Sequence, residues 1–148
     1  MKLIQIITAL AASVMMLSCA NKETPTVEYL DVTANNLAGN WEQVEWRGDE
    51  LVESSYFYMT IVRKDQLYTF YQNVDSMSDM PHVITGRFNL EIDPELGAII
   101  MGEYDYVGEF WSHRYIVKDL TADSMTWIAV DDPDETKKFI RVESIPVK

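Results

Sequence analysis

The sequence has few of the residues on which most catalytic and metal-binding sites depend. Its 148 residues include one cysteine, Cys19, and two histidines, His82 and His113. A single cysteine excludes a disulfide within the chain, and a zinc site would need both histidines to converge with a carboxylate. The nucleophile-elbow, P-loop and dinucleotide-binding motifs are also missing. We therefore expect no catalytic residue, no metal and no cofactor.

Positive charge is scarce as well. The 12 lysines and arginines stand against 24 aspartates and glutamates, which gives a formal net charge of −12. Binding to nucleic acid needs a positive face that displaces counterions from the phosphates, so we expect no nucleic-acid partner. The same charge repels anionic lipid headgroups, and we expect the domain to stand off a bilayer.

The longest apolar run of the chain lies at its N-terminus. Lys2 is followed by an uncharged apolar stretch from Leu3 to Leu17 and then by small residues. This pattern is typical of a secretory signal peptide, and the run is at the short limit for a transmembrane helix. We interpret residues 1–18 as a helical signal peptide that is removed.

The residues around the cysteine resemble a lipobox. The stretch is Met16-Leu17-Ser18-Cys19, with Met16 where leucine is usual. The resemblance implies that Cys19 becomes the acylated N-terminus, and several acyl chains at about 0.8 kcal/mol per buried methylene would hold it permanently on a membrane. The membrane is thus an expected partner, and the expected location is the cell envelope, at the outer membrane, on its periplasmic face or at the cell surface. The alternative is that Cys19 is discarded with the signal peptide.

The remainder divides into a tether and one domain. Residues 19–36 form the expected lipidated tether, because they are polar and interrupted by Pro25. Residues 37–148 are enough for one hydrophobic core and too few for two.

From residue 37 onward, the sequence pattern is that of short strands. β-Branched and aromatic runs recur at intervals of about ten residues and end in turn residues. In residues 86–93, Phe88, Leu90 and Ile92 alternate with polar residues, as in a half-buried strand. We predict an all-β domain: an eight-stranded antiparallel meander that closes into a barrel, with a flattened sandwich as the alternative and residues 75–81 as a flexible mouth or lid. The expected strands are residues 39–47, 56–63, 66–74, 86–93, 98–106, 110–119, 124–130 and 136–144.

Five segments of the domain carry a resemblance to a known family. They are residues 37–41 (LAGNW), 86–90 (GRFNL), 115–117 (YIV), 120–127 (LTADSMTW) and 139–142 (FIRV). Together they are similar to the lipocalin-like domain of small lipoproteins from Gram-negative anaerobic bacteria. The resemblance covers residues 37–145 and implies a barrel whose open end can hold a small apolar molecule. It also implies that Trp41 plugs the closed end and that Arg141 lies against Trp41 in a cation–π contact.

Two groups of acidic residues could form a functional site or could simply be solvated surface. Residues 131–135 (DDPDE) could offer oxygens to calcium, but they lack the spacing of a known loop, and a solvated hairpin turn is the simpler interpretation. Glu103 and Asp105 share one face of a strand, but a glycosidase pair would need the second carboxyl across a cleft. We expect both groups to be solvated surface.

Two functions from different classes follow from these patterns. The first is a lipid-anchored envelope protein whose lipocalin-like barrel binds a small apolar or amphipathic ligand among Trp41, Phe88, Tyr115 and Trp127. The alternative is a filled barrel that acts as a protein–protein interaction module in the envelope, for which exposed aromatic residues such as Trp46 and Trp111 would form one patch. An enzyme would need one of the two histidines beside a carboxylate in a cleft.

Overall fold

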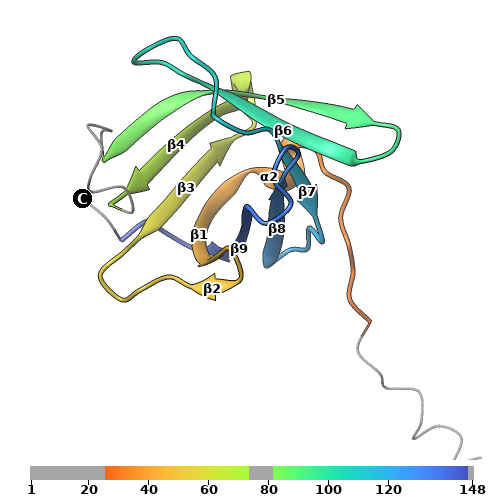
Figure 1. Cartoon of the computed structure of the whole chain (residues 1–148), viewed down its shortest axis with the longest axis horizontal. Helices are drawn as coiled ribbons and strands as arrows, with labels where there is room; N and C mark the ends of the chain where they lie inside the picture. The colour runs from red at the N-terminus through yellow and green to blue at the C-terminus, as the bar shows by residue number, and fades with distance from the viewer. Residues whose placement is uncertain (1–25, 74–81, 147–148) are drawn as a thin grey trace, which may run out of the picture.

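The computed structural model describes residues 26–73 and 82–146, and these fold into a closed antiparallel β-barrel (Figure 1). Nine strands form one sheet in which each strand pairs with its neighbour in the chain, except that β2 and β3 both pair with β1. The strands are β1 (Gly39–Trp46), β2 (Asp49–Glu50), β3 (Phe57–Val62), β4 (Leu67–Gln72), β5 (Val83–Asp93), β6 (Gly97–Tyr104), β7 (Tyr115–Lys118), β8 (Ser124–Ala129) and β9 (Thr136–Val142).

Pairing of the first long strand with the last closes the barrel. Asn40 of β1 lies opposite Val142 of β9, and the pairing continues to Trp46 and Lys137, with a β-bulge between Gln43 and Glu45. Eight strands form the ring, and the two-residue β2 is an addition to β1. The predicted eight-stranded antiparallel barrel is therefore confirmed, and a sandwich with open edges is excluded.

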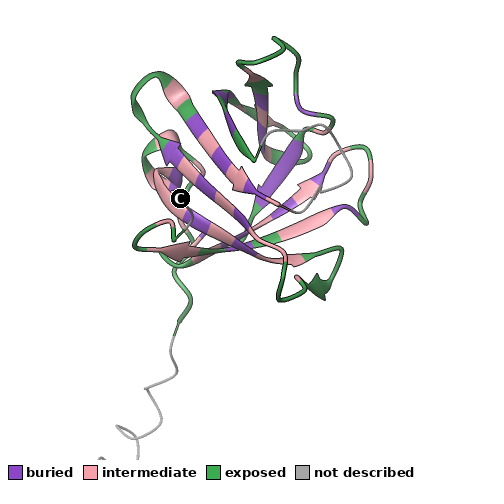
Figure 2. Cartoon of the chain, turned by 90° about the vertical axis from the view of Figure 1, so that its left-hand side faces the viewer, coloured by how far each residue is buried: buried purple, intermediate pink, exposed green. Residues whose placement is uncertain are grey.

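The alternation of apolar and polar residues sets which side of each strand faces inward. Buried and less buried residues alternate along β3, β4 and β8, and Figure 2 shows the purple and pink bands that result. In β5 the alternation holds from Ile84 to Phe88 and then ends, because the β5–β6 hairpin runs past its neighbours in the sheet. Ile92 near the hairpin tip is 73% exposed, so its expected inward position was wrong.

The strand expected at residues 110–119 is much shorter in the structure. Only Tyr115–Lys118 form β7, and Phe110 makes an isolated bridge to Glu103. The residues between them leave the sheet, which allows Trp111 to turn into the barrel, where it is 8% exposed.

One end of the barrel is closed by the segment that enters it. Thr33 caps the four-residue helix α2 (Ala34–Leu37) through a hydrogen bond from the Asn36 amide to its hydroxyl. Trp41 is fully buried next to α2 and donates from Nε1 to the carbonyl oxygen of Leu37, 2.9 Å away.

Arg141 lies over the ring of Trp41. Its guanidinium carbon is 4.2 Å from the centre of the Trp41 ring. The guanidinium also donates to the carbonyl oxygens of Ala38, Ala122 and Asn36 at 2.6, 2.7 and 2.9 Å. Arg141 thus ties β9 to α2 and to the β7–β8 turn, and we call this region the closed end.

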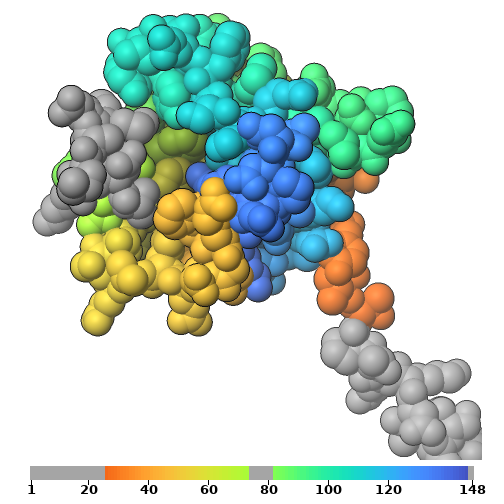
Figure 3. Space-filling view, viewed as in Figure 1, coloured from red at the N-terminus to blue at the C-terminus, as the bar shows by residue number. Residues whose placement is uncertain are grey.

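Part of the expected tether belongs to the folded domain. Leu30, Val32 and Ala34 pack against the core, and the Leu30 amide donates to the Leu120 carbonyl oxygen at 2.8 Å. The chain before these residues runs away from the barrel, as the orange segment in Figure 3 shows. The packed domain therefore begins near residue 30 and not at residue 37.

Several predictions concern residues outside the described ranges. These are the signal peptide of residues 1–18, lipidation of Cys19, and the mouth or lid at residues 75–81. Within residues 26–73 and 82–146, no helix is both long and apolar enough to cross a membrane.

Candidate functional site

The barrel contains a cavity of about 410 Å³ at the end opposite the closed end. Its place follows from strand direction, because the lining residues Trp46 and Lys137 lie at the opposite ends of β1 and β9 from Trp41 and Arg141. Small-molecule sites commonly enclose about 300–1,000 Å³. We call it the open-end cavity. It is lined by Gln43, Trp46, Phe57, Phe70, Gln72, Ile84, Tyr104, Trp111, Ser112, His113, Tyr115, Trp127, Glu135, Lys137 and Phe139.

Most of the cavity wall is aromatic. The ring centres of Tyr115 and Trp127 are 5.3 Å apart, and those of Trp127 and Phe139 are 4.9 Å apart. Phe57 and Phe70 continue the wall on β3 and β4 with ring centres 5.0 Å apart. Offset and tilted rings at these separations are favourable arrangements, so the wall is a rigid surface suited to apolar or flat ligand groups.

Trp111 reaches the cavity because a glycine leaves room for it. A Cβ atom on Gly102 would overlap the Trp111 ring. Trp111 stacks on Trp127 with ring centres 5.9 Å apart and donates from Nε1 to the Tyr68 hydroxyl at 2.9 Å. Tyr68 in turn donates to the Glu103 carbonyl oxygen at 2.8 Å, and burial raises the pKa of Tyr68, which keeps the phenol a neutral donor. Trp111 is therefore held in a fixed orientation.

Lys137 brings a positive charge into the aromatic wall. Its Nζ atom lies 5.2 Å from the ring centre of Tyr115 and 5.6 Å from that of Phe57. Burial lowers the pKa of Lys137, and the negative charge of Glu135 offsets part of this effect. Burial also raises the pKa of Tyr115, so the ring beside the ammonium stays neutral.

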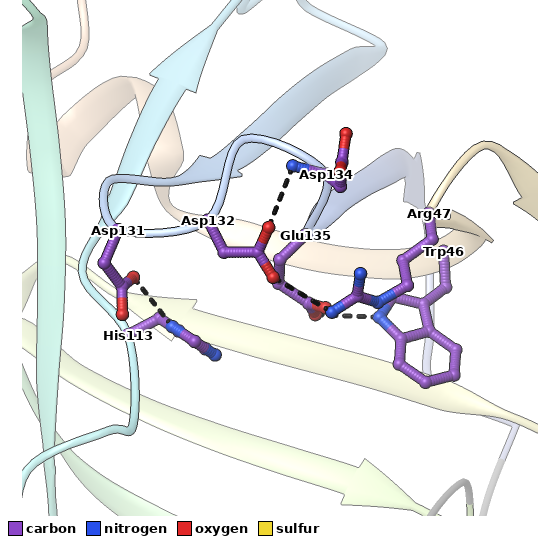
Figure 4. A network of polar contacts seen from close by, with 7 residues as sticks. All are labelled: Trp46, Arg47, His113, Asp131, Asp132, Asp134 and Glu135. Carbon is purple, nitrogen blue, oxygen red and sulfur yellow. Dashed lines mark hydrogen bonds and ion pairs between the residues drawn. The ribbon is translucent and has the colours of Figure 1, made fainter.

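Glu135 is buried at the rim of the cavity, and both of its oxygens have partners (Figure 4). Oε1 accepts a hydrogen bond from Trp46 Nε1 at 2.7 Å, and Oε2 lies 2.9 Å from Arg47. Arg47 also pairs with Asp132 at 3.1 Å, and the Asp132 carboxylate accepts from the Asp134 amide. The acidic turn is thus bound to the protein's own cation and amides, and no group of three metal-ligating side chains occurs in the described part of the chain.

The two histidines lie in different surroundings. His82 is exposed next to β5. His113 lines the cavity, with Nδ1 2.8 Å from Asp131 Oδ1, and this contact lowers the pKa of Asp131. An enzyme was expected to need a histidine beside a carboxylate in a cleft, and the His113–Asp131 pair meets that condition. Among the described residues, no hydroxyl or thiol is hydrogen bonded to His113, as the nucleophile of a hydrolytic triad would be. His113 can orient a ligand group at the rim.

The structure separates the four residues expected to line the ligand site. Tyr115 and Trp127 line the open-end cavity, whereas Trp41 and Phe88 do not. Trp41 and Phe88 are 0% and 1% exposed and belong to the core toward the closed end. Both side chains face inward as expected, but they lie in the part of the barrel that is packed with side chains. They therefore belong to the hydrophobic core and do not line the cavity.

A second hollow of about 480 Å³ lies on the outer surface beside β1 and β2. Four glutamates line it, and burial together with the charge of Glu42 raises the pKa of the Tyr58 hydroxyl there. Its carboxylates repel one another and have no described cation among the lining residues. The glutamates are Glu42, Glu45, Glu50 and Glu53.

No protein-family model matches this sequence, and no curated protein shows a significant similarity to it. The fold and the site define a closed antiparallel β-barrel with an aromatic internal cavity. Function is inferred from these two features.

Proposed function

We propose that this protein is a lipid-anchored envelope protein whose lipocalin-like barrel binds a small amphipathic molecule in the open-end cavity. The observation that carries the proposal is the aromatic cavity of about 410 Å³, which lies beyond a core of buried side chains. Eight-stranded barrels either fill their interior with side chains or hold one small ligand, and a cavity of this size favours the second arrangement. An aromatic wall with a few polar groups is typical of small-molecule sites.

The position of the cavity suits a protein held by its N-terminus. The lipobox-like stretch at Cys19 supports anchoring of the chain to a membrane. The chain joins the barrel at the closed end, where Leu30 pairs with Leu120. The cavity therefore lies at the opposite end of the barrel from the tether.

The two tryptophans expected to mark a filled interaction module lie in different places, although Tyr106 and Phe110 are exposed aromatic residues. Trp111 lies inside the barrel, where it stacks on Trp127, while Trp46 is 49% exposed at the rim. The two tryptophans thus form no common outer patch. The geometry favours the container over the interaction module.

Filling the cavity tests the proposal. Gln72 points inward from β4 at the cavity wall, whereas the adjacent Tyr71 faces outward. We expect the uncharged fluorophore 1-aminoanthracene to bind residues 20–148, which contain every described contact, and Gln72→Trp to weaken this binding by about tenfold or more because the indole occupies the cavity. Fluorescence titration measures the affinity, and circular dichroism checks the fold.

Tyr71→Trp is the matched control, since it adds an indole one residue away on the outer face. Its affinity for the fluorophore should equal that of the unchanged protein. Equal affinities for the Gln72→Trp and Tyr71→Trp variants, or no saturable binding to the unchanged protein, would contradict the proposal.

A further inference from the structure

Lys137 is the cationic side chain in the described lining of the cavity, apart from the titratable ring of His113. An ammonium group between two aromatic rings gains a cation–π contact but loses much of its hydration. Within the described part of the chain, no carboxylate lies at ion-pair distance from Lys137. A charge that is partly desolvated and lacks a partner is costly, and an incoming anion would supply the missing partner.

Two carboxylates close to the cavity residues already have partners within the protein. Both oxygens of Glu135 are taken by Trp46 and Arg47, and Asp131 pairs with His113. These pairs hold the acidic side chains at the rim. Among the described residues, the positive charge of Lys137 therefore has no carboxylate partner, in a chain that is acidic as a whole.

From this charge distribution we infer that the ligand carries a carboxylate group that contacts the Lys137 ammonium, while its apolar body lies against the rings of Tyr115, Trp127 and Phe57. This inference rests on the proposed function and names the ligand class of the same cavity. The ligand is thus an amphipathic carboxylic acid.

A monovalent anion fits better than a phosphate. One carboxylate neutralises one ammonium, whereas a phosphate monoester would bring a second negative charge close to Glu135. The Gln72 amide lines the same cavity and can donate to a carboxylate oxygen. The acidic outer surface opposes anion entry only weakly, because salt screens exposed charges over about 8–10 Å.

The test compares two ligands of equal chain length, one with an anionic headgroup and one with a neutral headgroup. Decanoate and 1-decanol have the same chain, and each is titrated against bound 1-aminoanthracene on residues 20–148. We expect decanoate to displace the fluorophore at a concentration about tenfold lower than decanol, because the charge-assisted hydrogen bond to Lys137 is available only to the anion.

Two adjacent lysines provide the matched variants. Lys137→Met removes the inward charge and keeps an unbranched apolar side chain, and we expect the decanoate-to-decanol preference to fall to about one. Lys138→Met removes a charge from the outer face, where Lys138 Nζ lies 4.0 Å from Glu45, and we expect the tenfold preference to remain.

The outcomes separate this inference from the proposed function. The inference is overturned if decanol matches decanoate on the unchanged protein, if neither displaces the bound fluorophore, or if Lys137→Met keeps the preference. Failure of 1-aminoanthracene itself to bind would instead overturn the proposed function.

Discussion

Replacement of Trp41 with alanine is expected to lower the free energy of unfolding by about 3–5 kcal/mol, the range typical of large aromatic residues removed from a core. Trp41 is fully buried, and its indole is held from two sides. Nε1 donates to the Leu37 carbonyl oxygen at 2.9 Å, and the Arg141 guanidinium covers the ring at 4.2 Å. Urea unfolding of residues 20–148, followed by circular dichroism, measures the change.

Trp41→Ala should also weaken the hydrogen bonds of Arg141, in addition to creating a cavity in the core. Arg141 uses the Trp41 ring as its support while it donates to Ala38, Ala122 and Asn36. A less ordered guanidinium would leave these carbonyl oxygens with weaker partners, and each lost bond costs about 1 kcal/mol.

Trp46→Ala is the matched control at the other end of β1. Trp46 is 49% exposed, donates one hydrogen bond to Glu135 and has the Arg47 guanidinium over its ring at 5.8 Å, so we expect a loss of about 1 kcal/mol. Similar losses for the two tryptophan variants would show that the closed end is not the stable part of the barrel.

Gly86→Ala is expected to lower the free energy of unfolding by about 3 kcal/mol, at the upper end of the usual range for overpacking. Gly86 faces inward on β5, and a Cβ atom there would overlap the carbonyl oxygen of Glu103 and the hydroxyl of Tyr68. The Glu103 oxygen is backbone within the β5–β6 pairing and cannot turn away. The strands must separate locally, and the hydrogen bond that orients Tyr68 and thereby Trp111 is disturbed.

Arg87→Ala controls for a substitution in β5. Arg87 is the next residue, is exposed and faces outward, so its loss should change stability by no more than about 0.5 kcal/mol. Thermal and urea unfolding of both variants give the comparison. A Gly86→Ala variant as stable as Arg87→Ala would mean that the close approach of Tyr68 and Glu103 to Gly86 is not maintained in solution.

The barrel could be predicted from the sequence because a period of two fixes which face of a strand is buried. In β5 the prediction used Phe88, Leu90 and Ile92, of which Phe88 is buried, and in the structure the alternation of burial lies at Ile84, Gly86 and Phe88. In β8 the same period is clear at Met125 and Trp127. It does not reveal where a strand leaves the sheet. A continuous strand was therefore expected at residues 110–119, and the inward turn of Trp111 was not predicted. The segment of residues 19–36 was judged polar as a whole, so the packing of Leu30, Val32 and Ala34 on the barrel was not predicted either.

Of the four residues expected to line the ligand site, two line the cavity, and the reason is related. Periodicity gives the inward face but not the depth along the barrel, so Tyr115 and Trp127 were placed in the cavity together with Trp41 and Phe88, which lie in the filled part. Lys137 was missed because a charged residue is usually read as outward. Its spacing from Phe139 was the available signal, since residues two apart in a strand share a face.

Native mass spectrometry of the protein purified from its own host's envelope tests the central claim most directly. The mass is recorded before and after denaturation, so that covalent acyl chains stay with the polypeptide while a molecule in the open-end cavity is released. We expect the loss of one small organic molecule on denaturation, with the mass and fragmentation pattern of an amphipathic carboxylic acid. The same mass before and after denaturation, in a preparation that also fails to take up added decanoate, would contradict the claim that the barrel is a container.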